Sequence, residues 1–278
     1  MSATPSTSLY ERYAAGAAEI YQQHFVPAIG EPFARRLLAS ARPLSGERVL
    51  DVACGTGIAT RLAADAVGPE GKAVGLDINP GMLEVARRVS ADDIDWIEAP
   101  AEEIPLSSDA FDLVMSAMGL QFMADPIGAL REMHRVSSPG GRVVSLTPGP
   151  TPPLFEAIDG ALVDHVGPEA SRFIHAVFRL HDPGDLRRLF QEAGFDDVRT
   201  ETGSLPLRVA PPADFFWQYV QSTPLAAITA ALDGQTRAAL EADVVERCEP
   251  YADGDATVME PGLTVVTGRA GHSEEVGG

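Results

Sequence analysis

Cysteine is scarce in this chain of 278 residues, which holds only Cys54 and Cys248. Two cysteines give neither the disulfide framework of a small secreted domain nor a C-x-x-C metal pair. Aspartate, glutamate and histidine are also not grouped at spacings that would commit them to Mg²⁺. The sequence therefore predicts a function that does not depend on a bound metal ion.

Positive charge is in short supply as well. The chain has 21 Lys and Arg against 40 Asp and Glu, so its formal net charge is −19 at pH 7. Such a charge repels a phosphate backbone, which argues against nucleic acid as a partner. No apolar run reaches the ~18 residues of a membrane span, and no signal peptide precedes Tyr10. We expect a cytoplasmic protein without a transmembrane segment.

The most informative stretch that is present runs from Val49 to Gly57. An apolar run over 49–52 stops at Cys54-Gly55-Thr56-Gly57, and a helical pattern begins at Ile58. This order predicts a strand, a tight glycine turn and a helix N-terminus. Bare glycine backbone and the free N–H groups of the helix suit a bound ligand. In an open parallel sheet, ligands bind at the carboxyl ends of the strands.

A third glycine is missing from this turn. The dinucleotide fingerprint is G-x-G-x-x-G, and Thr60 stands where its last glycine would be. Asp77 ends the next strand-like run about twenty residues after the turn, the usual distance of a carboxylate that binds ribose hydroxyls. A ribose-binding acid with only G-x-G suits a nucleoside without a pyrophosphate, such as S-adenosylmethionine. Because no catalytic Tyr/Lys pair lies within a helix, an NAD-dependent oxidoreductase is only a distant alternative.

Together with Asp77, the segment 49–57 resembles motif I and the acidic loop of class I S-adenosylmethionine-dependent methyltransferases. The match continues through the segments 101–105 (AEEIP), 111–114 (FDLV) and 135–141 (RVSSPGG). The chain is similar to the small-molecule branch with the ubiquinone- and menaquinone-type enzymes (methyltransferase domain 11) over roughly residues 10–270. The segment 116–119 (SAMG) lacks the Asn/Asp-Pro-Pro-aromatic signature of amino-group DNA methyltransferases, which excludes that class.

This resemblance implies an α/β fold with a doubly wound, mostly parallel seven-stranded sheet, an antiparallel edge strand and a helical cap. We expect strands at 49–52, 72–77, 94–99, 111–117, 142–147 and 198–207, and the antiparallel edge strand at 257–268. The expected segments are an N-terminal helical lid (1–43), a cofactor-binding core (44–148), a helical cap (149–182), the C-terminal part of the sheet with a helical insertion (183–270) and a disordered tail (271–278).

Three amphipathic stripes lie outside the predicted core. The first recurs at helical spacing through Tyr10, Tyr13, Ala17, Tyr21 and His24. Two more, over 155–166 and 173–178, follow a proline-rich link. Each stripe is either a plain packing face or a wall of the pocket. In similar methyltransferases the N-terminal helix covers the cofactor, which implies that Tyr21, and then Tyr13, faces the ligand.

The resemblance also implies the cofactor-binding residues. The family commonly has an Asp before the alanine that contacts adenine, and this chain has Pro100 there, so the contact falls to the backbone around Ala101 and to Glu102. Gln121 is placed near the methionine end of the cofactor, with a surface amide as the alternative. The predicted set is Tyr13, Tyr21, Asp51, Ala53, Cys54, Gly55, Thr56, Gly57, Asp77, Ile78, Met82, Pro100, Ala101, Glu102, Ser116 and Gln121.

No catalytic residue stands out in the sequence. S-adenosylmethionine carries its methyl group on a sulfonium, so the protein must mainly align the reactants and exclude water. A general base is optional, and His24 is the best candidate, with a packing role as its alternative. The expected acceptor is a small, apolar or aromatic metabolite. The sequence leaves open the identity of the acceptor, the atom that is methylated and whether the chain forms a homodimer. The alternative function is a cofactor-binding regulator or scaffold without transferase activity.

Overall fold

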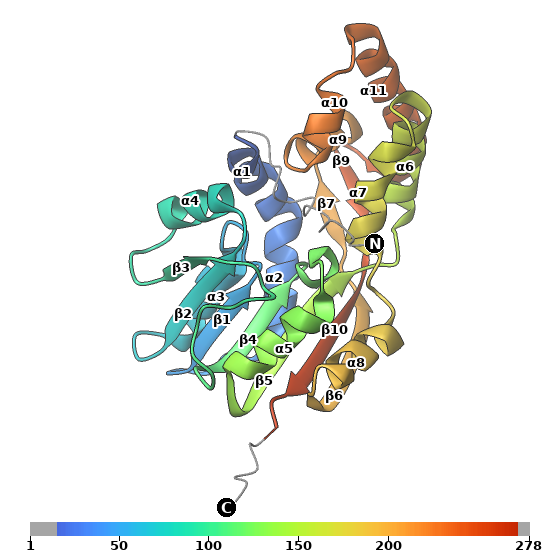
Figure 1. Ribbon diagram of the computed structural model, residues 1–278. Helices are drawn as coiled ribbons and strands as arrows, with labels where there is room; N and C mark the ends of the chain where they lie inside the picture. Colours follow the sequence, from blue (N-terminus) through green and yellow to red (C-terminus); the bar gives the residue numbers. More distant parts are fainter. Residues whose placement is uncertain (1–15, 272–278) are drawn as a thin grey trace, which may run out of the picture.

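The computed structural model describes residues 16–271, so Tyr10, Tyr13 and most of the predicted tail lie outside the described residues. Its main body is a seven-stranded sheet in the order β3-β2-β1-β4-β5-β10-β6 (Figure 1). The strands are β1 (Arg48–Val52), β2 (Lys72–Asp77), β3 (Asp95–Glu98), β4 (Phe111–Ala117), β5 (Ser137–Pro148), β6 (Asp196–Ser204) and β10 (Gly262–Arg269).

One strand of this sheet runs against the others. β1 to β5 pair in parallel, whereas β10 pairs antiparallel with both β5 and β6. The predicted mostly parallel sheet is confirmed, but its antiparallel strand lies second from the edge. The polarity of the two strands explains this order. Val265 and Val266 of β10 are buried, whereas Asp196 and Glu201 of the edge strand β6 are exposed. Charged side chains suit an edge, where they discourage pairing with another chain.

Helices cover both faces of the sheet. α2 (Glu31–Ala41) and α3 (Ile58–Val67) lie on one face, and α5 (Pro126–Val136) and α8 (Pro183–Glu192) on the other. Successive residues of β4 show the alternation, because Leu113 and Met115 pack with α2 and α3, and Val114 packs with α5 and α8. A doubly wound sheet buried on both faces follows from this pattern.

Side-chain caps fix where three helices begin. Asn79 and Asp182 each accept hydrogen bonds from two backbone N–H groups, at the starts of α4 (Pro80–Val89) and α8, and Asp125 accepts one, from the Gly128 N–H at the start of α5. A proline stands at the first turn of each helix, where its missing N–H costs nothing. An N-cap side chain followed by a proline therefore marks the start of each of these helices.

The N-terminal stripe belongs to one continuous helical segment. α1 (Ala17–Ile20), the π-helix η1 (Tyr21–Gly30) and α2 follow one another without a break. η1 contains Pro27, which lacks an N–H and would clash inside an ordinary α-helix, and the wider turn accommodates it. The helical spacing expected for Tyr21 and His24 is therefore found in a π-helix and not in an ordinary α-helix.

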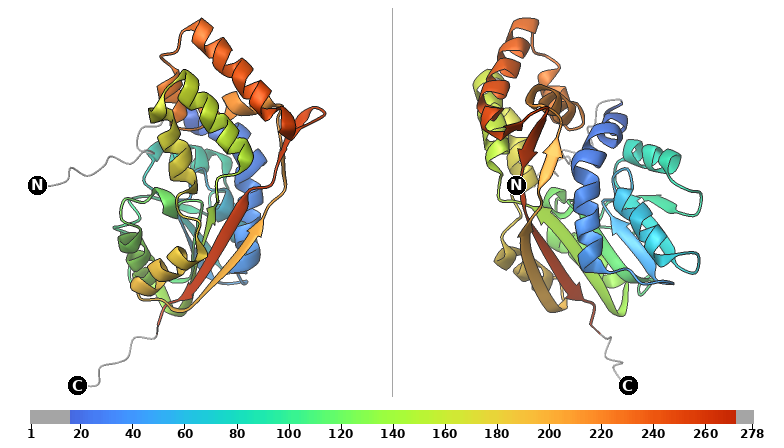
Figure 2. Two further views of the ribbon diagram at one scale, coloured as in Figure 1. Left: turned by 90° about the vertical axis from the view of Figure 1, so that its right-hand side faces the viewer. Right: turned by 180° about the vertical axis from the view of Figure 1, so that it is seen from behind.

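Helices and a small second sheet gather at one end of the main sheet (Figures 1 and 2). These elements, the cap, are α6 (Pro153–His165), α7 (Pro168–Phe178), α9 (Pro212–Gln221), α10 (Leu225–Thr229), α11 (Gly234–Cys248), β7 (Leu207–Val209), β8 (Ala252–Asp253) and β9 (Ala256–Met259). α11 packs on α6, where Arg247 pairs with Asp164 at 2.6 Å. The strands predicted at 198–207 and 257–268 are each divided, because β7 and β9 pair in the small sheet.

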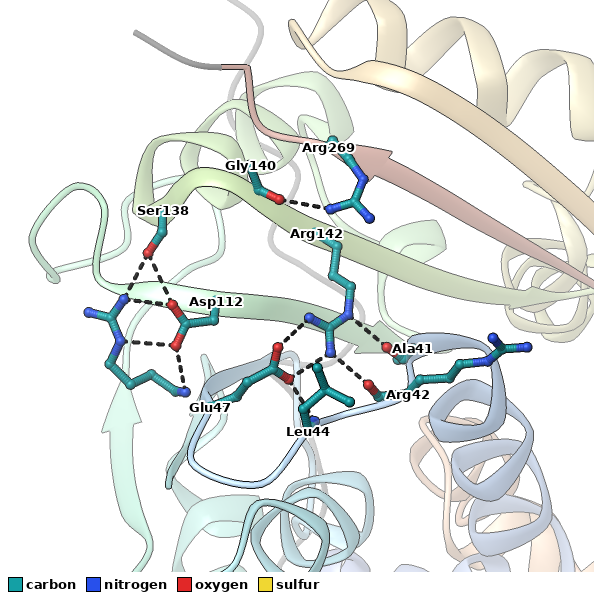
Figure 3. Close-up of polar contacts among 10 residues, drawn as sticks. Ala41, Arg42, Leu44, Glu47, Asp112, Ser138, Gly140, Arg142 and Arg269 are labelled. Carbon is teal, nitrogen blue, oxygen red and sulfur yellow. Dashed lines mark hydrogen bonds and ion pairs between the residues drawn. The ribbon is translucent and has the colours of Figure 1, made fainter. Parts of the chain in front are cut away.

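Arginine–carboxylate contacts tie the opposite end of the sheet together (Figure 3). The Arg142 guanidinium donates to Glu47 at 2.6 and 2.7 Å and to the backbone oxygens of Ala41 and Arg42. These bonds join the end of α2 to the start of β1. Arg48 pairs with Asp112 at 2.7 Å between β1 and β4. Among residues 16–271, no helix is long and apolar enough to cross a membrane.

Candidate active site

A cavity of about 390 Å³ lies between the carboxyl ends of the parallel strands and the cap. Ala53, Asp77 and Ala117, at the ends of β1, β2 and β4, line one half, and Phe155 and Tyr219 of the cap line the other. The volume falls in the range of small-molecule sites, about 300–1,000 Å³. The cavity therefore lies where a ligand is expected in a doubly wound sheet.

The turn after β1 presents bare backbone to this cavity. Ala53 and Gly55 both have positive φ angles, 59° and 56°. A Cβ atom added at Gly55 would meet nothing closer than Tyr21, 4.0 Å away. Gly57 is different, because a Cβ atom there would overlap the ring of Trp96. The two glycines predicted to flank the ligand thus have different roles. Gly55 faces the cavity, whereas Gly57 leaves space for the ring of Trp96.

Asp77 joins the ends of β1 and β2. Its carboxylate, 8% exposed, accepts one hydrogen bond from the Gly55 N–H at 2.7 Å and one from the Asn79 N–H at 2.9 Å. Burial raises the pKa of Asp77 above its ordinary value, and these hydrogen bonds oppose the shift. Since an ionised carboxylate has about four acceptor sites, Asp77 can hold these backbone N–H groups and still accept a hydrogen bond from a ligand.

Asp51 is buried beneath the same turn and is 1% exposed. One of its oxygens accepts a hydrogen bond from the Thr60 hydroxyl at 2.7 Å, and the other has no partner in the structure. Burial raises the pKa of Asp51 to about 7, the bond from Thr60 opposes the shift, and the charge of Asp77 adds to it. Thr60, noted in the sequence only as a missing glycine, is therefore the residue that orients Asp51.

Twelve of the predicted residues line the cavity. They are Tyr21, Asp51, Ala53, Cys54, Gly55, Asp77, Ile78, Met82, Pro100, Ala101, Glu102 and Gln121. One oxygen of Glu102 accepts hydrogen bonds from the N–H groups of Ala124 and Asp125, at 3.0 and 3.2 Å. That side chain holds the loop before α5, which leaves the backbone around Ala101 as the better partner for an adenine.

Four predicted residues are placed differently. Thr56 and Ser116 are buried behind the cavity wall, Gly57 packs under Trp96, and His24 is half-buried in η1 and does not line the cavity. A Cβ atom added at Gly119, just after β4, would lie 2.7 Å from the Ser116 hydroxyl. Ser116 thus supports the strand end from behind instead of reaching the ligand space.

The cap half of the cavity is aromatic. Phe155 meets Tyr219 edge to face at 5.0 Å between ring centroids, and Phe122 stacks with Phe173 at 6.3 Å. Among the residues that the structure describes, no Lys, Arg or His lines the cavity. The sequence indicates the stripes over 155–166 and 173–178, but nothing in it connects Tyr219 with the ligand space. That connection depends on tertiary packing.

No group of three His, Cys, Asp or Glu side chains in residues 16–271 could hold a metal ion. Metal independence nevertheless stays a prediction.

Known proteins show the same fold and similar sequences. A methyltransferase domain model (Methyltransf_11) matches residues 50–145. A demethylmenaquinone methyltransferase of Staphylococcus epidermidis is 34% identical over 201 residues, covering 66% of this chain and 81% of that protein. The Staphylococcus aureus enzyme of the same name is 32% identical over 196 residues, covering 66% of this chain and 79% of that protein.

The solved structures agree with these sequence matches. Phosphoethanolamine N-methyltransferase 2 of Haemonchus contortus, in complex with S-adenosyl-L-methionine, superimposes with a TM-score of 0.56 at 18% identity, covering 92% of this chain and 56% of that one. At this identity the likeness concerns the fold alone. The Staphylococcus relatives are similar enough to decide the family. The chain belongs to the class I S-adenosylmethionine-dependent methyltransferases.

Proposed function

We propose that this protein transfers the methyl group of S-adenosylmethionine to a small, uncharged, apolar or aromatic acceptor. The observation that carries the proposal is the single cavity, whose strand-end half is acidic and whose cap half is aromatic. A positively charged cofactor suits the acidic half. An anionic acceptor would find no basic side chain among the described lining residues, and burying it unpaired would be costly.

The residues at the strand ends fit this cofactor. Asp77 has free lone pairs for ribose hydroxyls, and Gly55 leaves its backbone open on the cavity side. The unpartnered oxygen of Asp51 suits an ammonium group of the methionine part. Met82 and the backbone around Ala101 are left for the adenine. These assignments, with that of Tyr13 outside the described residues, are part of the proposal.

The cofactor supplies the activated methyl group when it is bound, and the protein supplies alignment and a dry site. Phe155, Phe173 and Tyr219 are buried and line the acceptor half. They exclude water from the path between the two ligands and leave the acceptor few orientations. With no histidine among the described lining residues, we assign no general base, and His24 keeps a packing role.

The N-terminal segment acts as a lid in this proposal. Tyr21 lies over Gly55 and packs with Ala18, Met82 and Val85, and Glu19 pairs with Arg88 of α4 at 3.2 Å. We expect a ligand between the lid and the strand ends to add contacts on both sides. Adding S-adenosylhomocysteine should therefore slow amide hydrogen exchange over 17–30 and 154–178. Unchanged exchange in both segments would contradict the lid and cap assignment and leave the fold intact.

The decisive test is production of S-adenosylhomocysteine. The protein is incubated with S-adenosylmethionine and a library of neutral aromatic acceptors, beside a matched library of carboxylated analogues, and products are detected by a mass increase of one methylene. We expect turnover only with neutral acceptors. Turnover restricted to the carboxylated set would refute the acceptor class. Cofactor binding without product from any acceptor would favour a regulator or scaffold.

A further inference from the structure

One polar side chain in the cavity is not accounted for by the fold. Gln121 lies in the short helix η2 (Leu120–Phe122), directly after β4, and is 1% exposed. Neither its amide oxygen nor its amide nitrogen has a hydrogen-bond partner in the structure, and the residue lines the cavity. Buried side-chain amides are nearly always paired in native proteins, so an unpaired one beside a cavity indicates a ligand.

The backbone of this residue is held from the cap. Arg179, at the end of α7, donates from Nε to the Gln121 backbone oxygen at 2.6 Å and from Nη2 to the Met123 oxygen at 3.1 Å. Phe122 between them stacks with Phe173 of the same helix. The turn is therefore held by the cap on one side and by β4 on the other. These contacts set the position of the Gln121 backbone, from which its side chain extends.

The chemistry of an amide defines what it can bind. It offers one acceptor and two donors without any charge. The acidic side chains that line the cavity, including Asp51 and Asp77, complement the charged cofactor, whereas the described cap residues that line the cavity carry no charge. A neutral hydroxyl or carbonyl oxygen is thus the group that pairs with this amide at the least cost.

We propose that Gln121 selects the acceptor by hydrogen bonding to a hydroxyl or carbonyl oxygen on an otherwise apolar ring, and that Arg179 is a positioning residue for it. The inference rests on the proposed function and assigns Gln121 to the acceptor instead of to the methionine end of the cofactor. The proposed hydrogen bond joins the side-chain amide of Gln121 to the acceptor oxygen. Arg179 acts only through the backbone of the turn.

Binding of matched probes tests this assignment. Naphthalene and 1-naphthol differ by one hydroxyl, and their affinities are measured by fluorescence titration with S-adenosylhomocysteine at saturation. For the native protein we expect 1-naphthol to bind about 3- to 10-fold more tightly, as one net hydrogen bond allows. In Gln121→Leu this ratio should fall to about 1, with naphthalene and S-adenosylhomocysteine affinities within about twofold of the native values.

Substitutions of Arg179 test whether it positions Gln121 or only stabilises the fold. Arg179→Met should lower the 1-naphthol to naphthalene ratio, and Arg179→Lys, which can still donate to one carbonyl, should restore part of it. Arg172→Met is the matched control, because Arg172 lies on the same helix and pairs only with the exposed Glu169. A control that shifts the ratio as much as Arg179→Met would overturn the positioning role.

Two results would overturn the role of Gln121. The first is equal affinity of the native protein for both probes, or binding of neither. The second is a ratio that stays unchanged in Gln121→Leu while S-adenosylhomocysteine binds more weakly, which would place the amide at the cofactor. Failure of the native protein to bind S-adenosylhomocysteine at all would instead refute the proposed function, and calorimetry without any probe detects that case separately.

Discussion

Removing the Asp77 carboxylate should impair both the fold and the cofactor site, by amounts that can be separated. The side chain holds the N–H groups of Gly55 and Asn79, at 2.7 and 2.9 Å, in a site that is 8% exposed. Asp77→Ala leaves both N–H groups without this acceptor. A buried donor left unpaired costs about 1–3 kcal/mol. We therefore expect the free energy of unfolding to fall by roughly 2–5 kcal/mol.

The effect of Asp77→Ala on cofactor affinity is independent of this loss of stability. Two ribose hydroxyls donating to a carboxylate contribute about 1.5–3 kcal/mol each. Water replaces part of this in the variant, so we expect a net loss of about 2–3 kcal/mol, or roughly 30- to 150-fold in affinity for S-adenosylhomocysteine. Asp77→Asn keeps one acceptor oxygen, so it should lose less stability than Asp77→Ala and still bind the cofactor more weakly.

Urea unfolding and calorimetry on the same preparations measure the two quantities. Asp182→Ala is the matched control, because Asp182 accepts two backbone N–H bonds, at 2.8 and 2.9 Å, but does not line the cavity. It should cost about 1 kcal/mol of stability, as lost helix caps do, and leave affinity unchanged. If Asp77→Asn binds S-adenosylhomocysteine within threefold of the native protein, the ribose assignment is wrong.

Three further variants test other parts of the structure. Because the folded pKa of Asp51 is raised to about 7 from 3.8, its contribution to apo-protein stability is complete below about pH 4 and is lost as the pH rises through 7. In urea titrations the native protein should lose about 2–3 kcal/mol of stability between pH 5 and pH 8, and Asp51→Asn should remove this dependence. Gly119→Ala puts a Cβ atom 2.6 Å from that of Ala53, so we expect about 1–3 kcal/mol of destabilisation and weaker cofactor binding by calorimetry. Arg142→Met removes an ion pair between partly buried side chains and the two hydrogen bonds to the end of α2, although Glu47 keeps the hydrogen bond from the Leu44 N–H. It should lower stability by about 1–3 kcal/mol without changing cofactor affinity, and a changed affinity would show that this end of the sheet is coupled to the cavity.

The features that the sequence predicted correctly are local ones. The strand, turn and helix around Gly55 depend on residues within a few positions of one another. Such features follow from glycine conformation, proline and short side-chain hydrogen bonds, all of which can be read in order along the chain. The position of Asp77 at the end of β2 belongs with them, because its distance from the turn is set by one strand–helix–strand unit, whereas its role toward ribose stays a prediction.

The features that the sequence did not reveal depend on long-range packing. The sequence predicts that the Gly57 backbone faces the ligand, because nothing in the order of residues shows that Trp96 packs there. The position of β10 inside the sheet was missed for the same reason, although the apolar Val265 and Val266 opposed an edge position. The wide turn of η1 around Pro27 was interpreted as an ordinary helix, since π-helical and α-helical stripes differ little over ten residues.

The two halves of the cavity are joined by a short series of aromatic contacts. Tyr21 lies 4.0 Å from the Cβ position of Gly55 and stacks on Phe25 at 4.6 Å, and Phe25 lies 6.5 Å from Tyr219 of the cap. In the proposed function, a cofactor bound beside Gly55 contacts Tyr21, which is linked through Phe25 to Tyr219 in the acceptor half. Because side chains in a protein interior are close-packed, we expect the shape of the acceptor half to depend on whether the cofactor is bound.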